Sequence, residues 1–196
     1  MTTHSKTKSL LALVLAIALA ATGCSAQWIN IALQDLPVLT QMALNIAILA
    51  NTLSSGMQAS TADVAVIQNI SAQASRSLNL LQTLYSEYKA GPNATTLAKI
   101  QTVISSLNQN LPVLLESAHI SNSVLSARIS AAVNLILTTV NSFAALMPQN
   151  SASTSRRMQP ASLPDAKDLK RQWNQQVCAP SGNGAMDEAF AQSMLR

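Results

Sequence analysis

The sequence predicts an all-α protein, namely an up-down-up-down four-helix bundle with a flexible C-terminal tail containing one or two short helices. Apolar residues recur every three or four positions over four long segments, which is the period of a helix face. Short stretches of turn residues separate these segments. Glycine is scarce, and aromatic residues make up only 3% of the chain. This composition favours helices rich in alanine and leucine over a β-sandwich.

The first helix of the predicted bundle begins by Trp28 and stops within residues 54–56. Pro37 lies inside this helix, so we expect a kink there or a fresh start capped by Asp35. The apolar stripe of this helix consists of Ala32, Leu36, Leu39, Ala43, Ile46, Ala50 and Leu53. Its alternating spacing of four and three is that of a heptad seam.

The other three helices are separated by turn and capping residues. The expected N-caps are Ser60 or Thr61, Asn93, and Ser121 or Asn122, and the last helix ends at Pro148. Pro112 predicts a kink in the third helix. The three stripes are Ile67, Ile70, Ala74, Leu78, Leu81, Tyr85 and Tyr88; Leu97, Ile100, Ile104, Leu107, Leu111, Leu114 and Ala118; and Leu125, Ile129, Ala132, Ile136, Val140, Phe143 and Met147. Similar helix lengths and short connections predict antiparallel neighbours.

The composition changes after the fourth helix. Ser, Thr, Pro and Arg fill residues 149–162, which predicts a flexible linker. Residues 162–165, Ser-Leu-Pro-Asp, form a possible N-cap arrangement that opens a short helix through about Val177, and a second short helix is expected over residues 185–195. The predicted domains are therefore a signal peptide over 1–23, a helical bundle over 24–148, and a flexible linker with a basic tail over 149–196.

The N-terminus has the pattern of a secretory signal peptide. Lys6 and Lys8 precede an apolar run over residues 10–21, and small residues follow it. This run of about 12 residues is shorter than the roughly 20 that a helix needs to cross a bilayer. None of the later segments contains 18 consecutive apolar residues, so the sequence predicts no membrane-spanning helix in the bundle.

Residues 21–24, Ala-Thr-Gly-Cys, resemble the lipobox of bacterial lipoproteins, which usually has leucine at the first of these positions. The resemblance implies that Cys24 is diacylated and that the chain is cleaved between Gly23 and Cys24. It further implies an extracytoplasmic protein held in the cell envelope by lipid. In a Gram-negative host, Ser25 implies the outer membrane, at its periplasmic face or the cell surface. A secretory signal cleaved after Ala26 and an uncleaved membrane helix remain as alternatives.

The charges exclude a polyanion-binding function. After cleavage at Cys24 the chain has ten Lys and Arg against eight Asp and Glu. Only four cations and four anions lie between Ser25 and Asn150, so steering of charged ligands is expected to be weak. Nucleic acid is not an expected partner, because its recognition needs a concentrated basic face.

The sequence contains no recognisable catalytic, metal or cofactor site. His119 is the single histidine after the signal, and only Glu116 lies near it in sequence. A zinc site needs three or four ligands, and a catalytic base needs an orienting partner and a nucleophile. We therefore expect His119 to be a hinge residue, and we expect no enzyme activity.

Several residues have two interpretations. Trp28 either lies at the membrane interface or plugs one end of the bundle. Lys167, Lys170 and Arg171 either contact anionic head groups or form a solvated helix face. Cys178 either forms an intermolecular disulfide or remains a free thiol.

Tyr85 and Tyr88 either mark a binding edge or pack in the core and at its rim. For the whole protein, the expectation is a non-enzymatic structural or protein-interaction module, with an envelope protein as partner and with oligomerisation as a further option. The alternative is a carrier that binds an apolar ligand between the helices. Small residues in the seams, Ala43, Ala50, Ala74, Ala118 and Ala132, would leave room for that ligand.

Overall fold

The computed structural model describes residues 4–55, 59–147 and 164–196, with side chains from Trp28 onward in the first range. These residues form helices and no strands. The helices are α1 (His4–Ser55), α2 (Thr61–Ala90), α3 (Ala94–Ser117), α4 (Ser123–Ala145), α5 (Ala166–Gln176) and α6 (Gly184–Gln192). The predicted all-α class is thus confirmed for this part of the chain.

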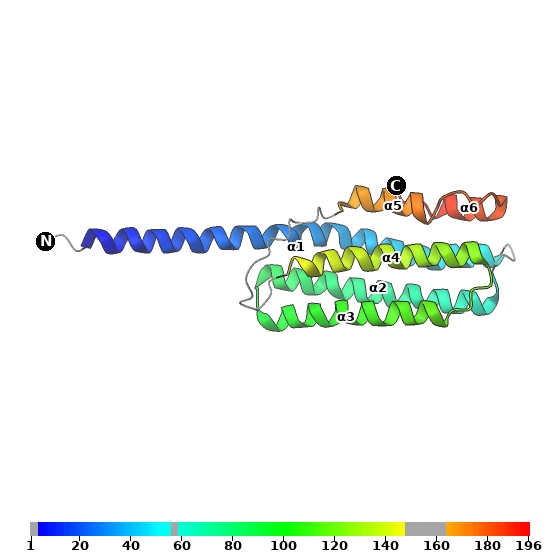
Figure 1. Cartoon of the computed structure of the whole chain (residues 1–196), viewed down its shortest axis with the longest axis horizontal. Helices are drawn as coiled ribbons and strands as arrows, with labels where there is room; N and C mark the ends of the chain where they lie inside the picture. The colour runs from blue at the N-terminus through cyan, green and yellow to red at the C-terminus, as the bar shows by residue number, and fades with distance from the viewer. Residues whose placement is uncertain (1–3, 56–58, 148–163) are drawn as a thin grey trace.

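The second half of α1 and helices α2, α3 and α4 lie side by side (Figure 1). The chain reverses direction at each connection, and α1 packs against both α2 and α4. The N-terminal half of α1 extends beyond the other helices. Consequently, α1 enters the packed region at the same end at which α4 leaves it.

The apolar stripes form one continuous core. Every stripe residue predicted for α1 and α4 is buried, as are the first six of α2 and the first five of α3. Tyr88, Leu114 and Ala118, at the ends of their helices, are half-buried. The heptad-like periodicity therefore identified the buried face of each long helix correctly.

The helix starts follow from their capping side chains. Ser60 and Asp63 form a reciprocal capping box at the start of α2. The Asn93 side chain accepts a hydrogen bond from the Thr96 N–H at 2.8 Å, and the Asn122 side chain accepts one from the Leu125 N–H at 3.0 Å. One of the two expected caps was correct at each of the α2 and α4 starts, and Asn93 was correct at α3.

Two prolines lie inside helices without ending them. α1 runs through Pro37 and α3 runs through Pro112. A fresh start after Asp35, one of the two expectations, is therefore wrong. Proline has no backbone N–H, so the carbonyl four residues before Pro37 lacks its helical donor. Because Pro37 is exposed, solvent can reach this carbonyl.

Residues 164–196 form α5 and α6, and they do not form the expected flexible tail. Both helices pack against α1, and α5 also packs against α4. Leu169, Trp173 and Val177, spaced by four residues, have no exposed surface. Met186 and Phe190 of α6 join the same core. Burial of this apolar stripe is the physical reason why residues 164–196 pack against the other helices. The expected flexible linker, residues 149–162, lies outside the described residues.

Two helical segments have the length and mean hydropathy of a membrane span. They are Trp28–Ser55 and Ser123–Ala145, with mean hydropathy of 1.4 and 1.5. Half of each is buried inside the protein. Core helices of globular proteins pass the same test, so hydropathy alone does not assign either segment to a membrane.

Candidate functional site

The candidate anchor lies close to the packed helices. Gly23 and Cys24 are in α1, and their side chains are outside the described residues. Trp28, the first described core residue, follows Cys24 by four positions. At 1.5 Å per residue this is about 6 Å along the helix axis. A lipid on Cys24 would thus hold this end of the protein next to a membrane.

Trp28 closes the core at this end. It is 6% exposed, and its ring meets that of Tyr85 edge to face, with centroids 5.5 Å apart. Tyr85 makes a second edge contact, at 6.5 Å, with Phe143. These three rings come from α1, α2 and α4, and the geometry is the favourable one for aromatic pairs. These contacts agree with the interpretation that Trp28 closes one end of the bundle, because little of the indole surface is left exposed to contact a membrane interface.

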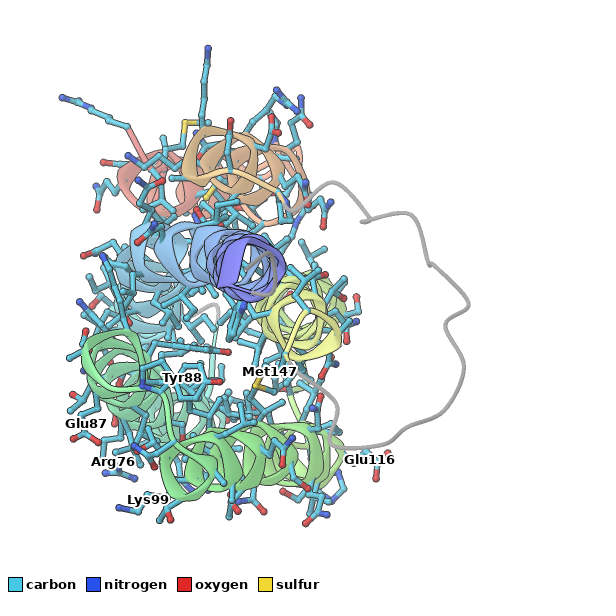
Figure 2. All side chains as sticks on the ribbon, turned by 90° about the vertical axis from the view of Figure 1, so that its left-hand side faces the viewer. Arg76, Glu87, Tyr88, Lys99, Glu116 and Met147 are labelled. Atoms are coloured by element: carbon cyan, nitrogen blue, oxygen red, sulfur yellow. The ribbon has the colours of Figure 1, made fainter. Side chains whose placement is uncertain are left out.

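Tyr88 and Met147 lie at the same end. Figure 2, viewed from the N-terminal side, shows both pointing inward between the helices. Tyr88 packs against the core and Met147 is 5% exposed. Tyr85 is fully buried, and burial raises the pKa of its phenol. Core and rim packing, not a binding edge, thus describes the two tyrosines.

The basic residues of α5 lie away from this end. Lys170 borders a groove with Pro37, Val38 and Gln41 of α1. Pro37 is 13 residues beyond Cys24, which is about 20 Å along the helix. Contact of these cations with head groups next to the lipid is therefore not supported when α1 stands upright on the membrane.

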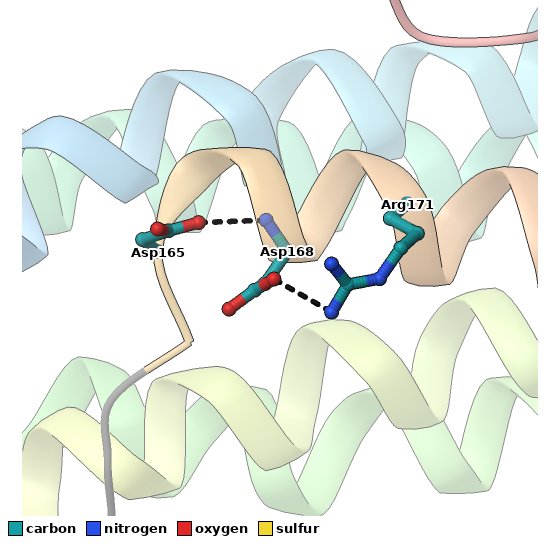
Figure 3. Close-up of polar contacts among 3 residues, drawn as sticks. All are labelled: Asp165, Asp168 and Arg171. Carbon is teal, nitrogen blue, oxygen red and sulfur yellow. Dashed lines mark hydrogen bonds and ion pairs between the residues drawn. The ribbon is translucent and has the colours of Figure 1, made fainter.

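Local contacts account for two of the three predicted cations. The Arg171 guanidinium pairs with the Asp168 carboxylate at 2.6 Å (Figure 3). Lys170 Nζ donates to the Arg196 carbonyl at 2.7 Å. Lys167 is exposed on the same helix. The arrangement is that of a solvated helix face, the second of the two interpretations.

Buried polar groups tie residues 164–196, hereafter the C-terminal unit, to α1. The Asn45 amide donates to the Ser193 carbonyl at 3.0 Å and accepts a bond from Gln41. The Trp173 indole N–H donates to the same carbonyl at 2.9 Å. Asn45, Trp173 and Ser193 are each at most 6% exposed. Such partnered buried groups specify one docking position, because a shifted position would leave them unpaired.

Arg128 joins the C-terminal unit to α4. Its guanidinium donates to the Gln176 carbonyl at 2.7 Å and to the Ala179 carbonyl at 3.1 Å. It also lies 5.7 Å from the centre of the Phe190 ring. Arg128, the only cation of α4, thus makes structural contacts with the C-terminal unit.

Asp35 of α1 is an acidic residue whose side chain is buried. It is 1% exposed, and its Oδ2 atom has no hydrogen-bond partner. Burial, with a further contribution from the Asp165 carboxylate, raises the pKa of Asp35 to about 7. From the sequence, Asp35 was expected only to cap a helix.

Cys178 is a buried free thiol. It is 2% exposed, and burial raises its pKa to about 11. Both properties oppose an intermolecular disulfide, since the thiolate is the reactive species. The free-thiol interpretation is the one that agrees with the structure.

The described parts of the chain contain no metal-binding cluster. No three His, Cys, Asp or Glu side chains there lie together in a way that could hold a metal ion. His119 and Glu116 are both exposed, and Glu116 lies at the periphery in Figure 2. These positions agree with a histidine in the connection between α3 and α4.

The cavities among these residues include open surface grooves. One of about 540 Å³ lies between α2 and α3, with Leu80 and Leu84 on one side and Ala98 and Val103 on the other. One of about 600 Å³ lies between α1 and the C-terminal unit. Neither is the enclosed cavity that a carrier needs.

The small seam residues also argue against a carrier. Four of the five, Ala43, Ala50, Ala74 and Ala132, have no accessible surface at all, and the fifth, Ala118, is half-buried at the end of α3. A cavity wide enough for a ligand would leave accessible surface on the residues that line it. These alanines therefore allow close helix packing.

The docking of the C-terminal unit and its buried polar contacts were not predicted from the sequence. The available signal was the spacing of Leu169, Trp173 and Val177, which places three large apolar residues on one face of a short helix. Such a face requires a partner surface. Asn45 and Asp35 had no comparable signal.

Comparison with family models, with curated proteins and with solved structures finds no match to this chain.

Proposed function

We propose that this protein is a lipid-anchored, extracytoplasmic, non-enzymatic module that binds another protein of the cell envelope. The observation that carries the proposal is the Cys24 motif followed four residues later by the first core residue, Trp28. An anchor so close to the packed helices restricts how far the protein can move from its membrane. The proposed attachment is stable, because two or more acyl chains hold a protein where one is marginal.

The proposed architecture is an up-down-up-down four-helix bundle of α1 to α4, with the C-terminal unit packed along α1. Chain reversals and the pairing of α1 with both α2 and α4 support this arrangement. In such a bundle both chain ends lie at one pole. The membrane would be at this pole, and the connections after α1 and between α3 and α4 would face away from it.

A structural or interaction role is supported by the character of the described surface. The exposed positions of α3 include uncharged polar residues, such as Gln101, Ser105 and Gln109. The groove between α2 and α3 presents apolar side chains beside Glu87 and Lys99, which lie on the outside of these helices (Figure 2). A surface of this kind suits contact with another protein better than capture of a charged small molecule.

The anchor is tested by replacing its cysteine. Cells expressing Cys24→Ala are grown with an alkyne-bearing fatty acid and are then fractionated. We expect no lipid label and loss of the protein from the membrane fraction. Cys178→Ala is the matched control, because its thiol is buried, and it should label like the wild type. If Cys24→Ala still labels and sediments with membranes, the proposal is wrong.

The interaction role requires a separate measurement. Crosslinking in intact native cells should give a discrete protein adduct with the wild type. The adduct should weaken when apolar groove residues Leu80 and Val103 are replaced by serine in a protein that remains folded. Failure to obtain any adduct, with labelling at Cys24 intact, would refute protein binding while leaving the anchor standing.

A further inference from the structure

Asp35 is the only charged residue within residues 28–55, the part of α1 whose side chains the structure describes. It is 1% exposed and lies near the start of α5, close enough to Asp165 for the two charges to interact. Its buried Oδ2 has no partner. An ionised carboxylate in such a position is unfavourable, because burial removes it from bulk water and Oδ2 has no donor to compensate its charge.

Among the described residues, no cation compensates the charge of Asp35. On α5, Arg171 pairs with Asp168 and Lys170 binds the Arg196 carbonyl. Only burial and Asp165 shift the pKa of Asp35 appreciably. The other charged or titratable groups on the elements packed against α1 are Lys167 on α5; Asp187 and Glu188 on α6; Arg128 on α4; and Asp63, Arg76, Tyr85, Glu87, Tyr88 and Lys89 on α2.

We infer that Asp35 makes the docking of the C-terminal unit on α1 sensitive to pH, so that the unit is held firmly in acid and loosens as the pH rises through neutrality. Docking removes water from the Asp35 carboxyl, and undocking restores it. The protonated carboxyl therefore favours the docked state, and the ionised carboxylate favours the undocked state. The inference does not depend on the lipid anchor.

The direction follows from proton linkage. The pKa of Asp35 is about 7 when the unit is docked, compared with 3.8 for an ordinary aspartate. A raised pKa means that a proton is taken up when the unit docks. The contribution of Asp35 to the stability of the docked state is therefore complete below pH 3.8 and is lost as the pH rises toward 7. From these two pKa values, the docking equilibrium constant is expected to fall by about 10- to 100-fold between pH 5 and pH 8.

Cys178 provides the readout, because it is buried in the C-terminal unit. In the full chain with Cys24→Ser, Cys178 is the only thiol. Its reaction with a disulfide reagent that works from pH 5 to pH 8 is compared with that of the same chain carrying Asp35→Asn. The ratio of the two rates cancels the intrinsic pH dependence of the thiol. We expect this ratio to rise at least tenfold between pH 5 and pH 8.

Asp168→Asn is the matched control, since it removes a carboxylate from α5 at an exposed ion pair. It should keep the wild-type pH dependence. Amide hydrogen exchange, corrected for its intrinsic pH dependence, serves as a second measurement if Asp35→Asn does not dock. Protection of α5 and α6 should fall with pH while that of α2 and α3 persists. A rate ratio constant within twofold, loss of the effect in Asp168→Asn, or equal loss of protection in all helices would each overturn the inference.

Discussion

Replacing Trp173 by alanine should detach the C-terminal unit from the other helices. The indole has no exposed surface, and its N–H donates to the Ser193 carbonyl at 2.9 Å. A buried aromatic side chain removes roughly 150–250 Å² from water, which at about 25 cal/mol/Å² gives an upper limit of about 4–6 kcal/mol. Measured changes from tryptophan or phenylalanine to alanine are typically about 3–5 kcal/mol. We therefore expect a loss of about 3 kcal/mol in docking free energy.

Thiol labelling and hydrogen exchange measure this loss. In a Cys24→Ser background, a change of about 3 kcal/mol corresponds to roughly 100-fold faster labelling of Cys178. Because Trp173 lies next to this thiol, amide exchange over α5 and α6 is the independent measure. Trp173→Phe is the matched control. It retains most of the apolar contact and loses the hydrogen bond, so it should cost about 1–2 kcal/mol.

The result that refutes this reasoning is specific. If Trp173→Ala labels within twofold of the wild-type rate and α5 and α6 retain their protection, the unit is not held by this side chain. If the unit were a solvated tail, both variants would behave like the wild type.

Two other substitutions test buried polar groups by denaturant unfolding. Tyr85→Phe should leave the free energy of unfolding unchanged or raise it by up to about 1 kcal/mol, because the buried phenol oxygen has no partner; a loss greater than that would contradict this assignment. Ser121→Ala should cost about 1–2 kcal/mol near neutral pH, because Ser121 donates to the Asp63 carboxylate at 2.9 Å. Burial raises the pKa of Asp63, but hydrogen bonds from Ser60 and Ser121 outweigh it and lower the pKa overall. This stabilisation is present above pH 3.8 and is lost as the pH falls through the lowered pKa, so the difference between wild type and variant should shrink in acid. A difference independent of pH would show that Ser121 does not act through Asp63.

Most of the helix boundaries were predictable from sequence. Asn93 and Asn122 cap helices at expected positions, and the cap of α5, Asp165, is the last residue of the N-cap arrangement expected over residues 162–165. Capping depends on residues three positions apart, and an apolar stripe depends on residues three or four apart. Both signals are local, so they survive without knowledge of the tertiary structure.

The candidate site was predictable only in part. The lipobox resemblance at Cys24 is a local pattern, and it remains the basis of the proposed anchor. The position of the α5 cations could not be inferred, because it depends on where α5 packs along α1. The periodicity of α5 shows that the helix has an apolar face, but it does not identify the surface that covers this face.

The sequence by itself determined the helical class, the buried stripes and the caps, because each follows from the geometry of a single helix. The tertiary structure decided that residues 164–196 pack as part of the core. It also decided that Asn45 meets Ser193, a contact between residues 148 positions apart. The altered pKa of Asp35 has the same origin, since burial in the packed structure raises it and the charge of Asp165, from a distant part of the chain, adds to the shift. Desolvation depends on every element that covers a group, and no local pattern carries that information.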